Sequence, residues 1–332
     1  MIAKAVKRVA LVGLGSIGRR HLRLLKALRP EVEVILVRSG HGRSWPEESL
    51  SKESVSSIVE AIAKDIDAAI ISSPAPYHVQ QAIQFIKAGI PLLIEKPLSH
   101  NMDDIQELKD LSDQMRVPIL VGYVLRHSTD LNYFGEKLSE NPVGQMIGAT
   151  IDCGSYLPDW RPEQDYRITV SACDDLGGGV LLELSHELDY ANWLFGPFQS
   201  VEATLRNSGT LDIDVEDTAD LILTSKSGLT ISIHLDFCRP DSIRQCFLEG
   251  SEGLLVWDGI AHSVRLRHES GESDFWPLTI ERDAMFSEQL RHFLSCIEEG
   301  DLPKVTLSDG IAVMNLIEAA RRSSRENLVV CL

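Results

Sequence analysis

Three glycines near the start of the chain have the spacing that could hold a pyrophosphate. Gly13, Gly15 and Gly18 form a G-x-G-x-x-G string between the apolar run 9–12 and a run of helical periodicity. A strand that ends in a tight glycine turn and opens a helix points backbone N–H groups and the helix dipole at one spot. The sequence therefore predicts a dinucleotide site here, with a plain tight turn for another ligand as the alternative. The residues expected in it are Gly13, Leu14, Gly15, Ser16, Ile17 and Gly18.

The end of the second predicted strand bears on the type of dinucleotide. A carboxylate about 20 residues beyond the glycines holds ribose hydroxyls, whereas a basic residue there accepts a 2′-phosphate. This chain has Arg38 and Ser39 at that place. Arg38 can stack on adenine and pair with a phosphate, and Ser39 can donate to it. We therefore predict NADP in preference to NAD; a solvated Arg38, with both cofactors bound alike, is the alternative.

Polar residues also follow the next predicted strands. Ser73, Pro74 and His78 come after the third strand, and Glu95 and Lys96 come after the fourth. Ligands gather at the carboxyl ends of strands in open α/β sheets, so we expect all five residues at the cofactor. A partly desolvated lysine at such a position can also be a charge or proton partner in the reaction. Elsewhere, a Glu-Lys-Pro sequence is usually a surface turn.

A histidine in the second half is the candidate general acid/base. Oxidation of a secondary alcohol removes the hydroxyl proton while hydride leaves carbon, and imidazole titrates near neutral pH. His186 follows the glycines 177–179; three-residue spacing places Glu183 on its helical face, and Asp189 or Tyr190 continues that face. A buried histidine on an amphipathic helix is the alternative. We hypothesise that Lys96 and His186 meet across an interdomain cleft at the reacting oxygen, with Glu183 as a further catalytic residue.

The segment 156–167 is dense in aromatic and guanidinium groups. Trp160 and Arg161 can cover a nicotinamide ring or clamp a phosphate, and Tyr166 and Arg167 can then face the substrate. Two arginines here favour an anionic substrate, such as a nucleotide sugar or uronate, over a neutral sugar. An ordinary loop with an aromatic anchor is the alternative.

The hydrophobic pattern indicates which elements position these residues. Up to residue 124, short apolar runs alternate with stretches of helical periodicity, which predicts an α/β fold with a doubly wound parallel (Rossmann) sheet. The expected strands are 9–12, 32–37, 68–71, 92–94 and 119–121, and 40–54 is the most loop-like stretch. We place the dinucleotide-binding domain at 1–124.

After residue 125 the pattern changes to alternation of apolar and polar residues, clearest over 229–237. Similar runs at 143–153, 200–206, 218–224, 245–249, 253–257 and 262–267 predict a large open, mostly antiparallel sheet, with helices near 186–195, 284–298 and 308–323. We place a substrate-binding and oligomerisation domain at 125–332, with the C-terminal helix able to pack back on the first domain. Few helices are available to cover both sheet faces, so a homodimer or homotetramer packed through this sheet is expected.

Five motifs occur in an order that resembles the Gfo/Idh/MocA oxidoreductases over nearly the whole chain. They are Gly13-x-Gly15-x-x-Gly18, Ser73-Pro-x-x-x-His78, Glu95-Lys96-Pro97, Gly122-Tyr-x-x-Arg126 and Gly177-Gly-Gly-Val-Leu-Leu-Glu183-x-x-His186-x-x-Asp189. The resemblance implies a Rossmann domain, an α/β domain with an open sheet, a nicotinamide cofactor, and a sugar, cyclitol or sugar-nucleotide substrate.

The resemblance also implies roles for single residues. Lys96 matches the active-site lysine and His186 the histidine of the second-domain motif. Glu183 lies near the family's aspartate, although the spacing is E-x-x-H in place of D-x-x-x-H. A Trp-Arg pair like Trp160 and Arg161 often lies beside the cofactor in this family. The residues assigned to the substrate are Arg126, Tyr166, Arg167, Asp189 and Tyr190.

Composition excludes several classes of protein. With 332 residues, 44% of them hydrophobic, the chain is long enough for two domains. Its formal net charge of −17 disfavours nucleic acid and anionic membranes as partners. Neither the six cysteines nor the histidines have metal-ligand spacing, so we expect no metal and a reduced environment. The first strand begins soon after Met1 and no apolar run reaches about 18 residues, so we expect a cytoplasmic protein without signal peptide or membrane span.

Together these features predict an NAD(P)-dependent oxidoreductase that acts on a hydroxyl or keto carbon of a sugar derivative. Two alternatives stay open at this point. One is a non-catalytic dinucleotide-binding sensor, because a fold does not fix a function. The other is a redox-neutral, NAD-dependent glycosidase that keeps its cofactor.

Overall fold

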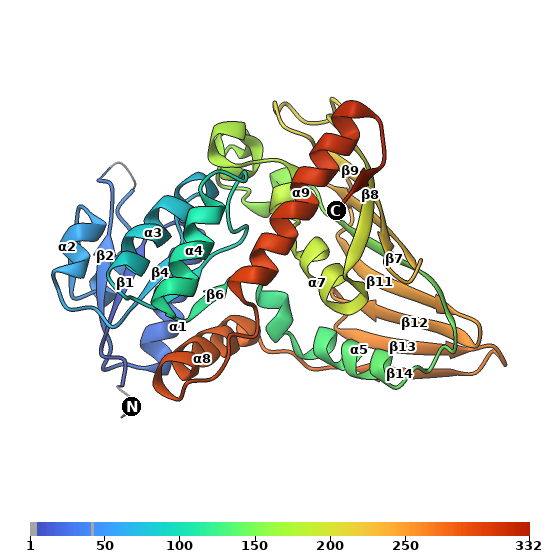
Figure 1. Ribbon diagram of the computed structural model, residues 1–332, viewed down its shortest axis with the longest axis horizontal. Helices are drawn as coiled ribbons and strands as arrows, with labels where there is room; N and C mark the ends of the chain where they lie inside the picture. The colour runs from blue at the N-terminus through green and yellow to red at the C-terminus, as the bar shows by residue number, and fades with distance from the viewer. Residues whose placement is uncertain (1–4, 41–42) are drawn as a thin grey trace. The chain divides into compact units, whose positions relative to one another are not determined.

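The computed structural model describes residues 5–40 and 43–332, which form two compact units (Figure 1). Unit 1 comprises residues 1–124 and 283–311, and unit 2 comprises residues 125–282 and 312–332. The expectation from sequence was one boundary, at residue 124. The stretch 283–311 lies in unit 1, although the chain passes through most of unit 2 before reaching it.

A six-stranded parallel sheet forms the centre of unit 1, in the order β3-β2-β1-β4-β5-β6. Its strands are β1 (Arg8–Val12), β2 (Glu33–Val37), β3 (Glu53–Val55), β4 (Ala68–Ile71), β5 (Leu92–Ile94) and β6 (Ile119–Val121). Apart from β3, the strands are almost entirely buried and apolar, as expected when helices cover both faces of a parallel sheet. This confirms the predicted Rossmann fold.

The helices of unit 1 are α1 (Ser16–Leu28), α2 (Ile58–Ile62), α3 (His78–Lys87), α4 (Ile105–Met115) and α8 (Ala284–Glu298). Helix α8 joins this unit because Leu290, Phe293 and Leu294 are buried in the same core as residues of α1 and β1. Strand β3 and the 3₁₀ helix η1 (Pro46–Leu50) begin within the stretch 40–54, which the sequence indicated only as a loop.

Unit 2 contains a nine-stranded sheet in the order β14-β13-β12-β11-β7-β10-β9-β8-β15. Its strands are β7 (Met146–Gly154), β8 (Phe198–Arg206), β9 (Thr218–Ser225), β10 (Thr230–Asp236), β11 (Ile243–Gly250), β12 (Gly253–Asp258), β13 (Ser263–His268), β14 (Ser273–Pro277) and β15 (Val330–Cys331). Strands β7 and β10 pair in parallel and the other neighbours are antiparallel, which confirms the predicted mostly antiparallel sheet.

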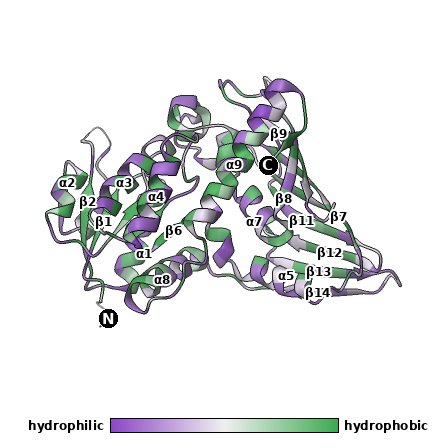
Figure 2. Ribbon diagram, in the orientation of Figure 1, coloured by the Kyte–Doolittle hydropathy of each residue, from purple (hydrophilic) through white to green (hydrophobic). Residues whose placement is uncertain are grey.

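Helices pack against one face of this sheet. They are α5 (Thr129–Ser139), α6 (Val180–Glu183) and α7 (His186–Phe195), and α9 (Leu307–Glu326) spans the boundary between the units. Along β10 buried residues alternate with exposed or half-buried ones, so the second face of the sheet is open to solvent. In Figure 2 the colours alternate accordingly along the unit 2 strands, whereas the central strands of unit 1 are mostly green. Within 5–40 and 43–332, no helix combines the length and apolar character needed to cross a bilayer.

Candidate active site

The glycine turn between β1 and α1 has one position open to a ligand and two that are needed for packing. Gly13 has φ +84°, and a Cβ on Gly18 would lie 2.4 Å from the carbonyl oxygen of Gly13 and 2.7 Å from Oγ of Ser72. A Cβ on Gly15 would have no atom within 4 Å. Gly13 and Gly18 therefore keep strand and helix in close contact, while Gly15 leaves space for a ligand to approach the backbone.

The start of α1 is suited to an anion. This helix of 13 residues begins after Gly15, which caps it without a side-chain hydrogen bond, and its first turn contains no acidic residue. Ser16 and Gly15 are exposed, Ile17 is half-buried, and Leu14 is buried beneath them. Backbone N–H groups and the positive end of the helix dipole thus face the open space, and this turn fits the pyrophosphate of a dinucleotide.

His78 connects the two loops that follow β4 and β5. Its Nδ1 lies 2.9 Å from the carbonyl oxygen of Pro97, and its Nε2 lies 2.7 Å from the carbonyl oxygen of Ser73. The ring is buried, and this burial lowers the pKa of His78. His78 was predicted at the cofactor, but its side chain holds the backbone of both loops in place. Ser73 and Pro74 are half-buried, and the Ser73 hydroxyl donates to Gln81 over 2.7 Å.

Glu95 lies beneath the following lysine. Its Oε1 is 2.6 Å from Nε2 of His21 on α1, with both side chains buried, and its Oε2 accepts the backbone N–H of Lys96 over 3.2 Å. Lys96 itself is half-buried. Glu95 was predicted to contact the cofactor, but its carboxylate faces the core. It joins α1 to the loop that carries Lys96. Sequence reasoning missed this partner, because His21 and Glu95 are 74 positions apart in the chain.

The end of β2 carries an ion pair. The Arg38 guanidinium pairs with Glu48 of η1 and donates to the carbonyl oxygen of Arg43. The side chain of Arg38 is 15% exposed, so it is not a solvated strand end, whereas Ser39 is exposed. Nearby, the guanidinium of Arg19 lies 3.8 Å from the ring centre of Trp45, a cation–π contact. Neither Glu48 nor Trp45 was among the predicted residues.

In unit 2, His186 is the first residue of α7 and Glu183 is the last residue of α6. Both side chains are half-buried, while Leu184 and Ser185 between them are buried. The structure thus places Glu183 and His186 on the accessible side of this helical segment. Both are therefore less buried than the two residues between them.

Three residues assigned to the substrate lie in the core of unit 2. Arg126 donates to both carboxylate oxygens of Asp189, over 2.8 and 3.1 Å, and its guanidinium lies 4.8 Å from the ring centre of Trp193. Tyr190 packs edge-on against Trp257, with ring centres 5.4 Å apart. Arg126, Asp189 and Tyr190 are all buried. Direct substrate contact conflicts with this burial, so we assign them to holding α7.

A second ion pair fixes the start of α7. Nε of Arg244 on β11 donates over 2.8 Å to Oε1 of Glu187, a fully buried carboxylate. Together with the pair of Arg126 and Asp189, it ties both acidic residues in the first turn of α7 to arginines of unit 2. The backbone of His186 is therefore held from two sides. The sequence did not single out Glu187 or Arg244, since isolated charges usually lie on the surface.

The segment after β7 is anchored by its own polar contacts. Nε1 of Trp160 donates to Oγ of Ser155 over 2.7 Å, and its ring packs edge-on against Phe237. Arg167 pairs with Asp165 at 2.8 Å and with Asp212 at 3.2 Å, which raises its pKa.

The other two predicted residues of this segment differ in their partners. The hydroxyl of Tyr166 accepts the backbone N–H of Asp212 over 3.3 Å, and Arg161 is exposed. The positive charge of Arg167, which favoured an anionic substrate in the sequence analysis, is therefore compensated by two carboxylates.

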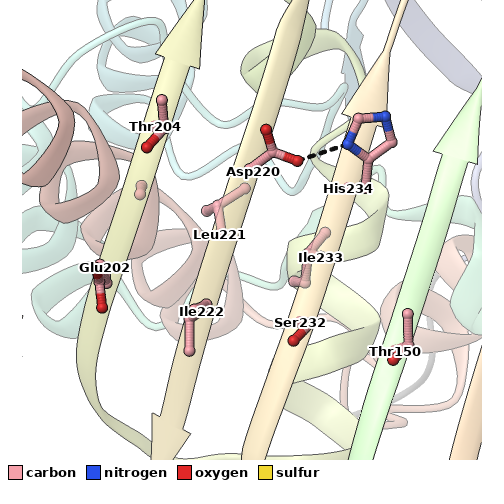
Figure 3. A pocket seen from close by; sticks show the side chains of 10 residues that line it. Thr150, Glu202, Thr204, Asp220, Leu221, Ile222, Ser232, Ile233 and His234 are labelled. Carbon is pink, nitrogen blue, oxygen red and sulfur yellow. Dashed lines mark hydrogen bonds and ion pairs between the residues drawn. The ribbon is translucent and has the colours of Figure 1, made fainter.

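A shallow hollow of about 240 Å³ lies on the open face of the unit 2 sheet, over β7, β8, β9 and β10 (Figure 3). It contains none of the predicted site residues. Nδ1 of His234 lies 2.6 Å from Asp220 there, and Asp236 together with Asp220 raises the pKa of His234 to about 9. In the part of the chain that the structure describes, no group of three His, Cys, Asp or Glu side chains could hold a metal ion.

Comparisons with known proteins agree with this geometry. Residues 7–123 match the model of an oxidoreductase family with an NAD-binding Rossmann fold, and residues 160–332 match the model of the C-terminal alpha/beta domain of an oxidoreductase family. The chain is 26% identical over 321 residues to 1,5-anhydro-D-fructose reductase of Ensifer adhaerens, with 92% of each chain covered.

Solved structures share the fold over the full length. Levoglucosan dehydrogenase in complex with NADH and levoglucosan superposes with a TM-score of 0.84, at 18% identity, and covers 98% of this chain and 99% of its own. The WlbA dehydrogenase from Bordetella pertussis, in complex with NADH and UDP-GlcNAcA, gives 0.80 at 21% identity, with 98% and 99% covered.

Proposed function

Since the chain belongs to the Gfo/Idh/MocA oxidoreductase family, we propose that it transfers hydride between a nicotinamide cofactor and a hydroxyl or keto carbon of a sugar-like molecule. The related proteins are named dehydrogenases and reductases, and this chain is a dehydrogenase or reductase of the same family. The observation that carries the proposal is the turn at Gly15, where the start of α1 has no side-chain cap and a Cβ would meet no atom within 4 Å.

The chain's own residues form a cradle for the cofactor. Backbone N–H groups after Gly15 bind the pyrophosphate, and Ser73 and Pro74 border the site from the loop after β4. When bound, the nicotinamide supplies the acceptor or donor of the hydride. Arg38 follows the last residue of β2, at the place where a carboxylate would hold the ribose, and on that basis we propose NADP in preference to NAD.

The proposed chemistry requires a proton acceptor and a charge partner at one hydroxyl. His186 takes the hydroxyl proton when the substrate is oxidised and returns it in the reverse direction. Lys96 keeps the same oxygen hydrogen-bonded and stabilises the negative charge that develops on it. Glu183, on the accessible side with His186, orients the imidazole or a substrate hydroxyl.

We propose a sugar or nucleotide-sugar derivative as the substrate. The related reductase is named for 1,5-anhydro-D-fructose, and the two similar structures hold levoglucosan and UDP-GlcNAcA. Because Arg167 is paired with two carboxylates, the case for an anionic substrate depends on the exposed Arg161 and on the segment around Trp160.

We also propose that the protein is a homodimer or homotetramer assembled through the open sheet face of unit 2. Ile222 on β9 is 43% exposed and Phe275 on β14 is 52% exposed, and Ile222 lies two residues along β9 from Asp220, the partner of His234. A second copy would remove these apolar side chains from water. A concentration-independent monomer mass in light scattering contradicts this assembly.

A titration with reduced dinucleotide followed by turnover assays tests the proposed function. NADPH and NADH fluorescence first measures binding by the purified protein. Nicotinamide reduction is then followed with a panel of sugars, polyols and nucleotide sugars. Dinucleotide binding without turnover of any compound would favour a sensor. Absence of both binding and turnover would contradict the proposed dinucleotide site.

A further inference from the structure

The ion pair at the end of β2 contains a carboxylate that is itself held in place. Oε1 of Glu48 accepts the backbone N–H of Trp45 over 2.7 Å and also pairs with Arg38. The Glu48 side chain is 30% exposed, about twice the exposure of its arginine partner. Glu48 therefore lies at the rim of the predicted cofactor site, with its charge directed at the guanidinium that was expected to bind a 2′-phosphate.

The neighbouring carboxylate has different partners. Oε1 of Glu47 lies 3.5 Å from Nη1 of Arg19 and 3.8 Å from Nε of Arg23, both on α1. The Arg19 guanidinium also covers the ring of Trp45. The two adjacent glutamates thus pair with different arginines: Glu47 with two arginines of α1, and Glu48 with Arg38. Only the pair of Glu48 and Arg38 includes the residue that directly follows β2.

We infer that Glu48 is a specificity-determining residue, which decides how strongly the site distinguishes a 2′-phosphate from a 2′-hydroxyl on the adenosine of the dinucleotide. The inference rests on the proposed function, because it requires that a dinucleotide binds with its adenosine ribose at the end of β2.

The chemistry of the two ligands explains this role. A 2′-phosphate needs the Arg38 guanidinium as a charge-assisted donor, so it has to displace a carboxylate and is repelled by that carboxylate. A 2′-hydroxyl carries a proton and can donate it to the same carboxylate. The hydrogen bond from Trp45 keeps the pKa of Glu48 below its usual range, so the opposing charge is present at neutral pH. Arg38 thus favours NADP and Glu48 opposes it.

Calorimetric titration with two fragments measures this effect without turnover. Adenosine 2′,5′-bisphosphate and adenosine 5′-monophosphate differ only in the 2′-phosphate. Glu48→Gln keeps an oxygen for the Trp45 N–H but removes the charge. We expect it to tighten binding of the bisphosphate about tenfold relative to the monophosphate, the effect of about one charge-assisted hydrogen bond.

Two further variants separate the charge of Glu48 from general effects. Glu47→Gln removes the adjacent charge, which faces other arginines, so the ratio of the two affinities should change by less than about twofold. In the Glu48→Gln/Arg38→Gln double variant, the gain should be smaller than in the single variant, because only the repulsion between carboxylate and phosphate is relieved and the guanidinium that would be released is absent.

An unchanged ratio in Glu48→Gln, or an equal shift in Glu47→Gln, overturns the role of Glu48. These outcomes differ from failure of the proposed function. If neither fragment binds to any form of the protein, the dinucleotide site is wrong and the inference falls with it. If the wild-type protein prefers the monophosphate but Glu48→Gln shifts the ratio toward the bisphosphate, the proposed NADP preference is wrong and the role of Glu48 stands.

Discussion

Replacing Gly15 with alanine separates ligand binding from folding. Gly15 has φ −71°, which alanine adopts without strain, and the new Cβ would have no atom within 4 Å. Alanine stabilises the folded state by about 0.4–1 kcal/mol by restricting the unfolded chain. At a helix N-cap it is less favourable than glycine, by up to about 1 kcal/mol. The two effects nearly cancel, so we expect the free energy of unfolding to change by less than about 0.5 kcal/mol.

Binding should respond very differently. The methyl group added by Gly15→Ala occupies the space through which a pyrophosphate reaches the N–H groups of α1, so we expect dinucleotide affinity to fall at least tenfold, about 1.4 kcal/mol. Fluorescence titration with NADPH and NADH measures the affinity, and thermal denaturation without ligand measures stability. We expect the melting temperature to stay unchanged while the dissociation constant rises.

Gly18→Ala is the matched control in the same turn. Its Cβ would lie 2.4 Å from the Gly13 carbonyl oxygen and 2.7 Å from Oγ of Ser72, both inside the unit. Overpacking of this kind costs about 1–3 kcal/mol, so this variant should melt several degrees lower, at roughly 2–4 °C per kcal/mol. The proposed role of Gly15 is refuted if Gly15→Ala binds dinucleotide like the wild-type protein, or if it loses as much stability as Gly18→Ala.

Three further predictions concern catalysis, the core of unit 2 and pH. Lys96→Met and His186→Asn should each lower kcat at least about 100-fold and change cofactor affinity by less than about threefold, in steady-state and binding assays. Arg126→Met removes the bidentate partner of the buried Asp189 carboxylate and should cost about 3–5 kcal/mol in urea unfolding. Because Asp236 and Asp220 raise the pKa of His234 to about 9, its protonated form adds stability that is complete below the unfolded value of about 6.5 and is lost as pH rises through about 9. His234→Gln should therefore remove this part of the stability–pH curve, as measured by thermal denaturation.

Features encoded by neighbouring residues could be predicted from the sequence. The strand, glycine turn and helix around Gly13 to Gly18 are contiguous, so local pattern suffices for them. The alternation over 229–237 likewise predicted β10 (Thr230–Asp236) as a strand with one buried and one open face. Lys96 stood out because it follows a predicted strand in a Glu-Lys-Pro sequence, and His186 because it follows the glycines 177–179 and has carboxylates beside it.

Pairings between distant residues could not be predicted in this way. His21 and Glu95 are 74 positions apart, and Arg126 and Asp189 are 63 apart, so only the folded chain makes them partners. Before folding, each one is indistinguishable from a solvated charge or a lone histidine. The ion pair of Glu48 and Arg38 also depends on the 3₁₀ helix η1, which lies in the stretch that the sequence indicated as a loop.

The helical face around His186 shows a different limit. A continuous helix would place Asp189 and Tyr190 on the side of Glu183 and His186, which is why the sequence assigned them to the substrate. The structure has two helices here, and α6 ends at Glu183 before α7 begins at His186. In α7, Asp189 and Tyr190 are buried: Asp189 pairs with Arg126, and Tyr190 packs against Trp257. Hydrophobic periodicity alone does not reveal these partners from other elements.

Reduction of the nicotinamide by a sugar-like alcohol tests the central claim most directly. The purified protein is mixed with NADP⁺ or NAD⁺ and each compound of a library of sugars, polyols and nucleotide sugars, and the absorbance of reduced nicotinamide is recorded. We predict that at least one compound gives reduction matched by formation of a keto product, and that Lys96→Met abolishes it. The proposed function is contradicted if the wild-type protein binds dinucleotide but reduces it with no compound, or if it retains cofactor unconsumed while it cleaves a glycosidic bond.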